Sequence, residues 1–470
     1  METHERTTAV EQLRQLGSQA QDPGLREALN FLSSAVVAGN IENSSDVTIG
    51  NQIRKVVYNV SVPAEAAAAL AELRLLPSSG FELDTEIYQL GSLVAEKAKE
   101  FVGREYVFAA LDAFTARETK GYFIIIADPG MGKSSIIAEL VRRKGCVSHF
   151  NVRSLGVNTA AHFLRSVCAQ LIVDAELPYA HLPRQMLEDG AFLNQLLKEA
   201  AEKIAPEPLV IAIDALDEVD EDEGVRGANI LFLPKTLPDN VYIVMTQRKA
   251  DVRLVTLSAI EKLDMMTRPK ENRDDVVAFL GQAANRPKLR DWIAQHPKQG
   301  DQPFSRERFV EQLATLSGNN FMYLRYVLPE IERGAYDKLE ADQLPSGLEG
   351  YYDEHWSLMG MREKPLPHEK ILILYVLCEV RHPISRRMIA ECLAGEGVGD
   401  VEVQGVLDQW QQFLTRFASA GDATYSIYHA SFRDFLHRKD VIDAAGTSLP
   451  DIHRLIGQDL HARLYGGAAP

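Results

Sequence analysis

Four short segments with the pattern of strands, three of them continuously apolar, lie in the middle of the chain, and amphipathic segments separate them. The run at residues 122–126 is aromatic and β-branched, which is typical of a strand buried on both faces of a parallel sheet. The segments at 133–144 and 159–174 carry apolar residues at helical spacing. Strands that alternate with helices predict an α/β domain with a doubly wound parallel sheet, whose ligands bind at the carboxyl ends of the strands. The four predicted strands are residues 122–126, 146–152, 209–213 and 241–245.

After about residue 268 the apolar pattern is helical and no further buried strand is expected for about 100 residues. A different order follows, in which three helices precede a hairpin, and this order predicts a winged helix. The helices expected before the winged helix are residues 274–284, 309–316 and 321–333. Within the winged helix, we expect helices at 370–380, 385–393 and 401–414 and hairpin strands at 416–418 and 425–428.

The first 80 residues form a separate segment, in which helical spacing gives way to an extended stretch and then to an Ala-rich helix. A Pro-Ser-Ser-Gly sequence at 77–80 ends it and is a candidate linker. The predicted organisation is therefore a small N-terminal α+β module, a nucleotide-binding α/β domain, a helical domain, a winged-helix domain and a C-terminal helix or tail. Their predicted bounds are 1–80, 81–265, 266–350, 351–440 and 441–470.

Composition narrows the class of protein. The chain has 470 residues, 46% of them hydrophobic, and a formal net charge of -16. Such an acidic chain repels nucleic acid and anionic lipid surfaces, so a nucleic-acid partner is not expected. The N-terminus has no apolar signal core, and no apolar run approaches the roughly 20 residues of a membrane span. The four cysteines have no metal-binding spacing and are expected to be reduced thiols, so we predict a cytoplasmic protein.

The strongest chemical signal is the sequence Ala-Asp-Pro-Gly-Met-Gly-Lys-Ser at 127–134, directly after a predicted buried strand and at the start of a helix. This is the context of a phosphate-binding loop, although Ala127 stands where the first glycine is usual. Backbone N–H groups would face the phosphates of ATP or ADP, Lys133 would reach the β- and γ-phosphates, and Ser134 would ligate Mg²⁺. The residues expected to hold the nucleotide here are Pro129, Gly130, Met131, Gly132, Lys133, Ser134 and Ser135.

A second signal follows the strand at 209–213, where the sequence continues Asp-Ala-Leu-Asp-Glu. Asp214 would lie beside the phosphate-binding loop and hold Mg²⁺ together with Ser134. Asp217 and Glu218 lie on the same turn, and either could act as the general base; the sequence does not choose between them. Arg248, at the end of the fourth strand, could contact a γ-phosphate.

Two further positions are weaker candidates. Val102, Gly103 and Arg104 lie at a break between two helices, where the glycine alone indicates only a turn. His429 lies at a junction between strand and helix, where a histidine is commonly structural.

Together and in this order, these pieces resemble the NACHT clade of the STAND class of P-loop NTPases, over residues 101–438. The strand followed by Asp214, a small residue and Leu-Asp-Glu is the mark of that clade, whereas the segment at 316–321 lacks the Gly-x-Pro of the plant-resistance and apoptosome branch. The resemblance implies that Val102, Gly103 and Arg104 contact adenine, that Arg248 is a sensor arginine, and that His429 holds the β-phosphate of ADP.

Members of this class are slow ATP hydrolases that act as signalling switches, many of them in innate immunity or programmed cell death. The resemblance implies a chain that is closed with ADP and self-associates into a homo-oligomer with ATP. It also implies an unknown trigger ligand or sensor partner, and a downstream effector reached through residues 1–80.

The alternative is a DNA-associated AAA+ ATPase, which also joins a P-loop domain to a winged helix. The residues 395–415 that would face the DNA groove have no lysine or arginine and carry several acidic side chains, which argues against it.

Overall fold

The computed structural model describes residues 90–465 apart from 180–181, 183–189, 221–228, 250–251, 253, 296–297, 300–301, 337–343, 381 and 418–421. The predicted N-terminal module at 1–80 therefore lies outside the described residues. The chain divides into two compact units. Among the described residues, the first unit consists of the residues up to Ile126, Lys133–Asn151 and Asn158–Met265. The second unit consists of Ala127–Gly132, Val152–Val157 and the residues from Met266 onward.

The first unit contains a five-stranded sheet in the order β2-β3-β4-β1-β5, and every neighbouring pair is parallel. The parallel α/β sheet predicted from the apolar runs is therefore confirmed. The edge strand β5 was not predicted, because its sequence mixes apolar and charged residues and only Leu263 of its six residues is buried. The strands are β1 (Gly121–Ile126), β2 (Val147–Phe150), β3 (Leu209–Asp214), β4 (Val241–Gln247) and β5 (Ala259–Asp264).

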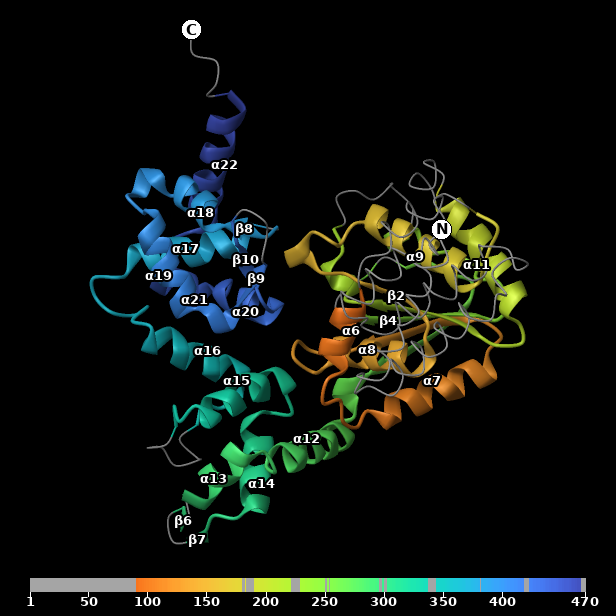
Figure 1. The fold of residues 1–470 in the computed structure, drawn as a ribbon, viewed down its shortest axis with the longest axis horizontal. Coiled ribbons are helices and arrows are strands. Elements are labelled where there is room, and N and C mark those ends of the chain that lie inside the picture. Colours follow the sequence, from red (N-terminus) through yellow and green to blue (C-terminus); the bar gives the residue numbers. More distant parts are fainter. Residues whose placement is uncertain are drawn as a thin grey trace, which may run out of the picture. The chain divides into compact units, whose positions relative to one another are not determined.

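Helices cover both faces of this sheet (Figure 1). Side chains alternate across the strands, so Tyr122 and Ile124 of β1 pack in a cluster with α9 and α11, while Phe123 packs against Phe114 of α7 with 5.7 Å between ring centroids. Helix α8 contacts β3 and β4. The helices of this unit are α6 (Leu90–Ala98), α7 (Glu105–Arg117), α8 (Lys133–Lys144), α9 (Ala160–Asp174) and α11 (Ala191–Ile204).

The second unit begins with a run of helices. The predicted helices at 274–284, 309–316 and 321–333 are present with longer starts or shorter ends, and α13 and α16 add to them. An antiparallel pair of strands, each two residues long, interrupts the run of helices. The sequence indicated no strand in this region, and that expectation is corrected here. The elements are α12 (Pro269–Ala283), α13 (Pro287–Gln295), β6 (Lys298–Gln299), β7 (Gln302–Pro303), α14 (Arg306–Leu316), α15 (Phe321–Glu332) and α16 (Gly347–Leu358).

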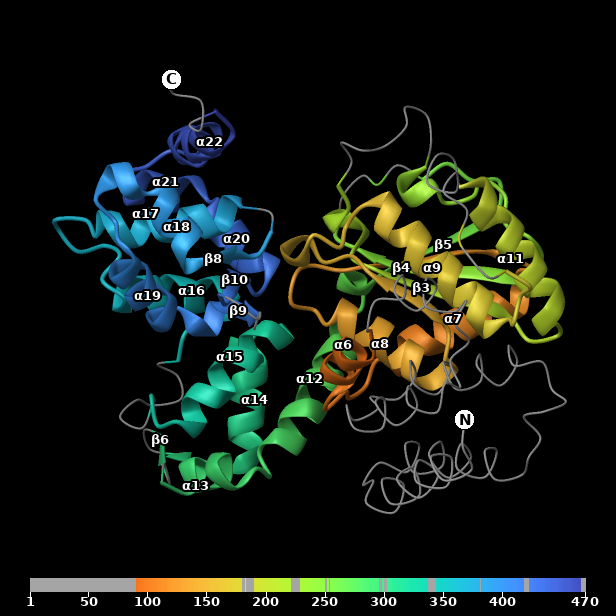
Figure 2. The ribbon, with the colours of Figure 1, turned by 45° about the horizontal axis from the view of Figure 1, so that its top comes forward.

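The remainder of the second unit combines helices with a small antiparallel sheet in the order β8-β10-β9. Figure 2 shows α17 and α18 near strands β8 and β10. The helix predicted at 401–414 is too long: α19 ends at Gln409, and Leu414 pairs with Ile427 in the sheet. The elements are α17 (His368–Glu379), β8 (Ile384–Ser385), α18 (Arg386–Cys392), α19 (Asp400–Gln409), β9 (Leu414–Phe417), β10 (Thr424–Ile427), α20 (Ala430–Leu436), α21 (Lys439–Ala445) and α22 (Leu449–Tyr465).

Aromatic side chains build the core of this part of the second unit. Phe413 and Phe432 stack with 4.5 Å between centroids, and Trp410 stacks on Phe432 at 5.8 Å. Trp356 of α16 meets Trp410 edge to face. These rings, all at most 1% exposed, fix α16, the turn 410–413 before β9, and α20 to one another. None of the helices that the structure describes combines the length and the apolar character that a membrane-spanning segment needs.

Candidate nucleotide-binding site

The glycines of the 127–132 loop have the backbone that a phosphate-binding loop requires. Gly130 and Gly132 have φ values of +81° and +86°, where a side chain is strained. A Cβ added at Gly132 would meet nothing within 4 Å. The loop therefore borders open space, and helix α8 begins immediately after it at Lys133. Lys133, Ser134 and Ser135 form the first turn of that helix, where N–H groups and the helix dipole favour an anion.

The loop belongs to the second unit, where the start of helix α15 holds it. Asn320 donates from Nδ2 to the Pro129 carbonyl at 2.9 Å, while its Oδ1 accepts from the N–H groups of Met322 and Tyr323. The N–H of Phe321 also donates to the Gly130 carbonyl at 3.0 Å. These bonds use carbonyl oxygens of the loop, whereas phosphate binding uses N–H groups, so both sets can exist together.

Asp214 ends strand β3 and is 4% exposed. Burial raises its pKa, and hydrogen bonds from the Ser134 and Thr246 hydroxyls oppose that rise. Thr246 of β4 lies between the two other strands of the site, because β4 separates β1 from β3 in the sheet. Its hydroxyl donates to Asp214 and accepts from the Ala215 N–H at 2.8 Å. The structure thus brings together Ser134 and Asp214, the two predicted metal ligands.

Asp217 and Arg248 form a pair on the same side of the sheet. The Arg248 Nε lies 3.0 Å from Asp217 Oδ2, and the Arg248 N–H donates to Oδ1 at 2.9 Å. Both carboxylate oxygens of Asp217 thus contact Arg248. The backbone of Glu218 is held separately, since Asn158 Nδ2 donates to its carbonyl at 3.0 Å. Asp217 therefore orients Arg248, which is a distinction that the sequence did not make.

The turn that carries these acids is a strained one. Ala215 adopts a left-handed conformation, with φ 52° and ψ 57°, and precedes the short 3-10 helix Leu216–Glu218. A left-handed alanine costs roughly 1–2 kcal/mol, which the surrounding bonds must offset. Those bonds are the Thr246 contact to its N–H and the Asn151 Nδ2 bond to the Asp214 carbonyl at 2.7 Å. Backbone strain of this kind is concentrated at functional sites.

The break before α7 is real and is made by two consecutive left-handed residues, Gly103 with φ 78° and Arg104 with φ 64°. Arg104 is 2% exposed, and its guanidinium donates to the Tyr106 hydroxyl at 3.4 Å. These two left-handed residues end the helical backbone between α6 and α7. The predicted contact of Val102, Gly103 and Arg104 with adenine remains a prediction.

His429 caps helix α20. Its Nδ1 accepts from the Ser431 N–H at 3.2 Å and lies 2.6 Å from the Ser431 hydroxyl. Ser431 in turn contacts the Tyr352 hydroxyl at 2.9 Å. Because Nδ1 accepts a backbone hydrogen bond, the neutral ring carries its proton on Nε2. Nδ1 has a structural role, so any contact with ADP would fall to Nε2, and that contact remains a prediction.

The residues present fit a magnesium nucleotide. Mg²⁺ prefers oxygen ligands and keeps several waters, and the Ser134 hydroxyl and the Asp214 carboxylate lie against each other at one edge of the sheet. The open space at Gly132 and the lysine at the start of α8 suit a polyphosphate. Ser134 and Asp214 would hold the metal, and Gly130 to Ser135 the phosphates.

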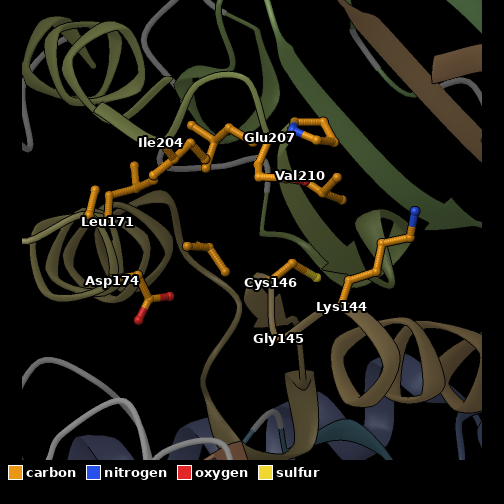
Figure 3. A pocket seen from close by; sticks show the side chains of 12 residues that line it. Lys144, Gly145, Cys146, Leu171, Asp174, Ile204, Glu207 and Val210 are labelled. Atoms are coloured by element: carbon orange, nitrogen blue, oxygen red, sulfur yellow. The ribbon is translucent and has the colours of Figure 1, made fainter. Parts of the chain in front are cut away.

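A separate cavity of about 500 Å³ lies at the opposite edge of the sheet (Figure 3). Val147 and Leu209, the first residues of β2 and β3, line it, so it is remote from the carboxyl ends of the strands. Apolar side chains such as Leu171 and Ile204 line it together with the charged Lys144, Asp174 and Glu207. Burial raises the pKa of Cys146 to about 12, so its thiol is protonated at neutral pH and is a poor nucleophile. All four cysteines are free thiols.

Sequence reasoning missed Thr246, Asn151, Asn158 and Asn320. Thr246 had a visible signal, because a threonine near the end of an otherwise apolar buried strand needs a polar partner. Asn320 had only the signal of a helix N-cap, since it is separated from Pro129 by 191 positions.

Residues 100–243 match a family model described as an AAA ATPase domain. No curated protein matches the chain. Among solved structures, a Walker-type ATPase of Pyrococcus abyssi is similar at 13% sequence identity, with 73% of this chain and 95% of that chain covered and a TM-score of 0.31. That TM-score is too low for the likeness to support an argument. The family match and the parallel sheet agree, and this chain contains an AAA-type ATPase domain of the P-loop kind.

Proposed function

We propose that the chain is an ATP- and ADP-dependent signalling switch of the NACHT type, closed with ADP and assembled into a homo-oligomer with ATP. The observation that carries the proposal is the bond between the nucleotide loop and helix α15. Asn320 contacts the loop with one side-chain atom and caps α15 with the other. A ligand that changes the loop conformation therefore changes the environment of α15, which is the differential contact that a population shift needs.

In this proposal the residues of the ATPase site have separate roles. Lys133 neutralises the β- and γ-phosphates, and Ser134 and Asp214 hold Mg²⁺. The metal, when bound, neutralises charge that develops on the phosphate oxygens. Asp217 holds Arg248 in place for the γ-phosphate, and Glu218 accepts the proton of the attacking water. The assignment of Glu218 rests on the engagement of both Asp217 oxygens with Arg248.

The finer part of the proposal concerns ADP. The elements from α17 to β10 have the order of a winged helix, and His429 follows β10. In the ADP state, the Nε2–H of His429 would donate to the β-phosphate of ADP. The Nδ1 atom of the same ring would continue to cap α20. Val102, Gly103 and Arg104 would hold adenine. The trigger and the effector reached through residues 1–80 are part of the proposal by resemblance alone.

The test is to denature the purified full chain, identify the released nucleotide, and measure the native mass of the same preparation. The proposal expects about one ADP per chain in a monomer, and a shift to a larger assembly after exchange into ATP. A protein whose mass is the same with ADP and with ATP would contradict the switch.

A DNA-associated AAA+ ATPase is the second candidate, and the AAA family match supports it equally. Helix α19 begins with Asp400 and Glu402 and also carries Asp408, while Arg386 and Arg387 lie on α18. An acidic α19 would repel the DNA backbone. Binding of duplex DNA at physiological salt that weakens on mutation of Arg386 and Arg387 would favour this candidate over the switch.

A further inference from the structure

Three side chains with metal-binding atoms converge on one side of helix α17, far from the nucleotide motifs in sequence. They are Cys378 and Glu379 at the end of α17 and His437 just after α20, and their ligand atoms all lie within 4.8 Å of one another. Cys378 Sγ is 3.5 Å from His437 Nε2, and the same nitrogen is 2.6 Å from Glu379 Oε1. His453 of α22 lies 2.6 Å from the other oxygen, Glu379 Oε2.

We propose that Cys378, Glu379 and His437 form a binding site for a divalent transition metal of the Zn²⁺ class, while His453 orients the Glu379 carboxylate through its other oxygen. A thiol, an imidazole and a carboxylate are donor types that zinc takes, and three protein ligands with one water make a tetrahedral site. This site is independent of the proposed function of the nucleotide loop.

The distances fit this chemistry. Ideal tetrahedral bonds place a thiolate sulfur and an imidazole nitrogen about 3.6 Å apart, close to the separation of Cys378 and His437. An imidazole nitrogen and a carboxylate oxygen would lie about 3.3 Å apart on the metal. His437 and Glu379 would thus separate by less than 1 Å from their hydrogen-bonded positions. Such a movement is open to His437, whose side chain is 37% exposed.

The burial of the group favours a specific site over a solvated ion cluster. Cys378 is 3% exposed and the Glu379 side chain 10%, so the two residues are anchored in the core while His437 provides access from solvent. Metal binding would form a thiolate at Cys378 and release its proton to solvent. The bound ion would join the end of α17 to the residue after α20, two helices that already pack together.

Cobalt provides a direct probe, because a Co²⁺–thiolate bond absorbs in the near ultraviolet and oxygen ligands do not. The full chain is freed of metal with a chelator and titrated with Co²⁺ without nucleotide or magnesium. We expect the thiolate band to saturate at one Co²⁺ per chain and to disappear on addition of one equivalent of Zn²⁺. Binding of Co²⁺ at Asp214 would give no such band, so the two sites are distinguished.

Variants show which cysteine gives the Co²⁺–thiolate band. Cys378→Ser should abolish it and weaken Zn²⁺ binding at least tenfold, while Cys392→Ser on α18 should leave both unchanged. If circular dichroism shows that Cys378→Ser does not fold, His437→Gln carries the test, because its partly exposed side chain can be replaced without opening the core; it should weaken Zn²⁺ binding by a similar factor. No thiolate band in the unmodified chain, or a band that survives Cys378→Ser, would overturn the site.

Discussion

Asn320 donates a hydrogen bond from Nδ2 to the carbonyl oxygen of Pro129 at 2.9 Å, and its Oδ1 caps helix α15. The same side chain thus fixes a phosphate-loop peptide and the first turn of a helix. The close approach leaves no room at the neighbouring Gly130, where an added Cβ would lie 2.2 Å from Asn320 Oδ1. The glycine is therefore required by the asparagine as well as by its own positive φ.

We expect Asn320→Ser to weaken ADP binding with little loss of stability. Serine is a good N-cap, so the cap on α15 is kept to within a few tenths of a kcal/mol, but its hydroxyl is too short to reach the Pro129 carbonyl. Loss of that bond should reduce affinity by about fivefold, as for one net hydrogen bond. Calorimetric titration with ADP and magnesium measures it.

The matched control is Ser305→Ala, which removes the N-cap of α14, where the Ser305 hydroxyl accepts from the Arg308 N–H, at a cost of about 1 kcal/mol. Weakened ADP binding in Ser305→Ala as well would mean that helix stability, and not the loop contact, controls affinity.

Thr246→Val should destabilise the ATPase domain by about 1–3 kcal/mol, because the partly buried Ala215 N–H loses its acceptor and the buried Asp214 carboxylate loses a donor. Thr246→Ser keeps the hydroxyl, so its free energy of unfolding should fall only by the contribution of one buried methyl group. Urea unfolding of both variants, followed by far-ultraviolet circular dichroism, makes the comparison. Equal losses for Val and Ser would show that packing, and not the bonds to Ala215 and Asp214, determines the cost.

Asp217 and Arg248 should be energetically coupled in ATP turnover, whereas Glu218 should act separately. In a double-mutant cycle, Asp217→Asn combined with Arg248→Gln should cost less than the two single losses together, because each removes the same pair. Glu218→Gln should abolish turnover and leave ATP bound. Additive losses in the cycle would contradict the pairing, and full turnover by Glu218→Gln would move the base elsewhere.

The second unit should become less stable at acidic pH because its buried His355 resists protonation in the folded state. Burial among Phe413 and Trp410 lowers the pKa of His355 to about 4, below the ordinary value of 6.5. As pH falls, His355 therefore binds a proton in the unfolded chain before it does so in the folded chain. The contribution of neutral His355 to the free energy of unfolding is complete above pH 6.5 and is lost as pH falls toward 4. Between pH 7.5 and pH 5 the loss amounts to about 2 kcal/mol.

His355→Gln should remove that part of the pH dependence, whatever its effect on stability at neutral pH. His368→Gln, at a side chain that is 57% exposed, is the control and should leave the dependence unchanged. Unfolding of each protein by urea at pH 7.5 and pH 5 gives the difference. Parallel pH profiles for His355→Gln and the unmodified chain would contradict the assignment.

The sequence predicted those parts of the site that lie in one contiguous stretch. Strand β1, the glycine loop and α8 follow one another, and the predicted helix at 133–144 has the bounds of α8. Strand β5 was not predictable from apolar pattern, because an edge strand buries only some of its side chains. The helix at 401–414 was extended too far, since Trp410 and Phe413 continue the helical spacing although the chain turns there into β9.

Contacts between distant parts of the sequence could not be predicted in this way. Thr246 meets Asp214 only because β4 is placed between β1 and β3, and the order of strands is not written in their apolar patterns. The choice of Asp217 as the partner of Arg248 likewise depends on the turn made by a left-handed Ala215. The proximity of Glu379 to His437 and to His453 depends on the packing of three helices.

The central claim is that the loop before α8 binds ADP or ATP through Lys133. Titration of the full chain with ADP and magnesium should show one site per chain, and Lys133→Ala should weaken it roughly a hundredfold, as expected for loss of a charged hydrogen bond to phosphate. Lys144→Ala, at the other end of α8 where the lysine pairs with Asp112 at the surface, should bind like the unmodified chain. Tight ADP binding by Lys133→Ala would contradict the account.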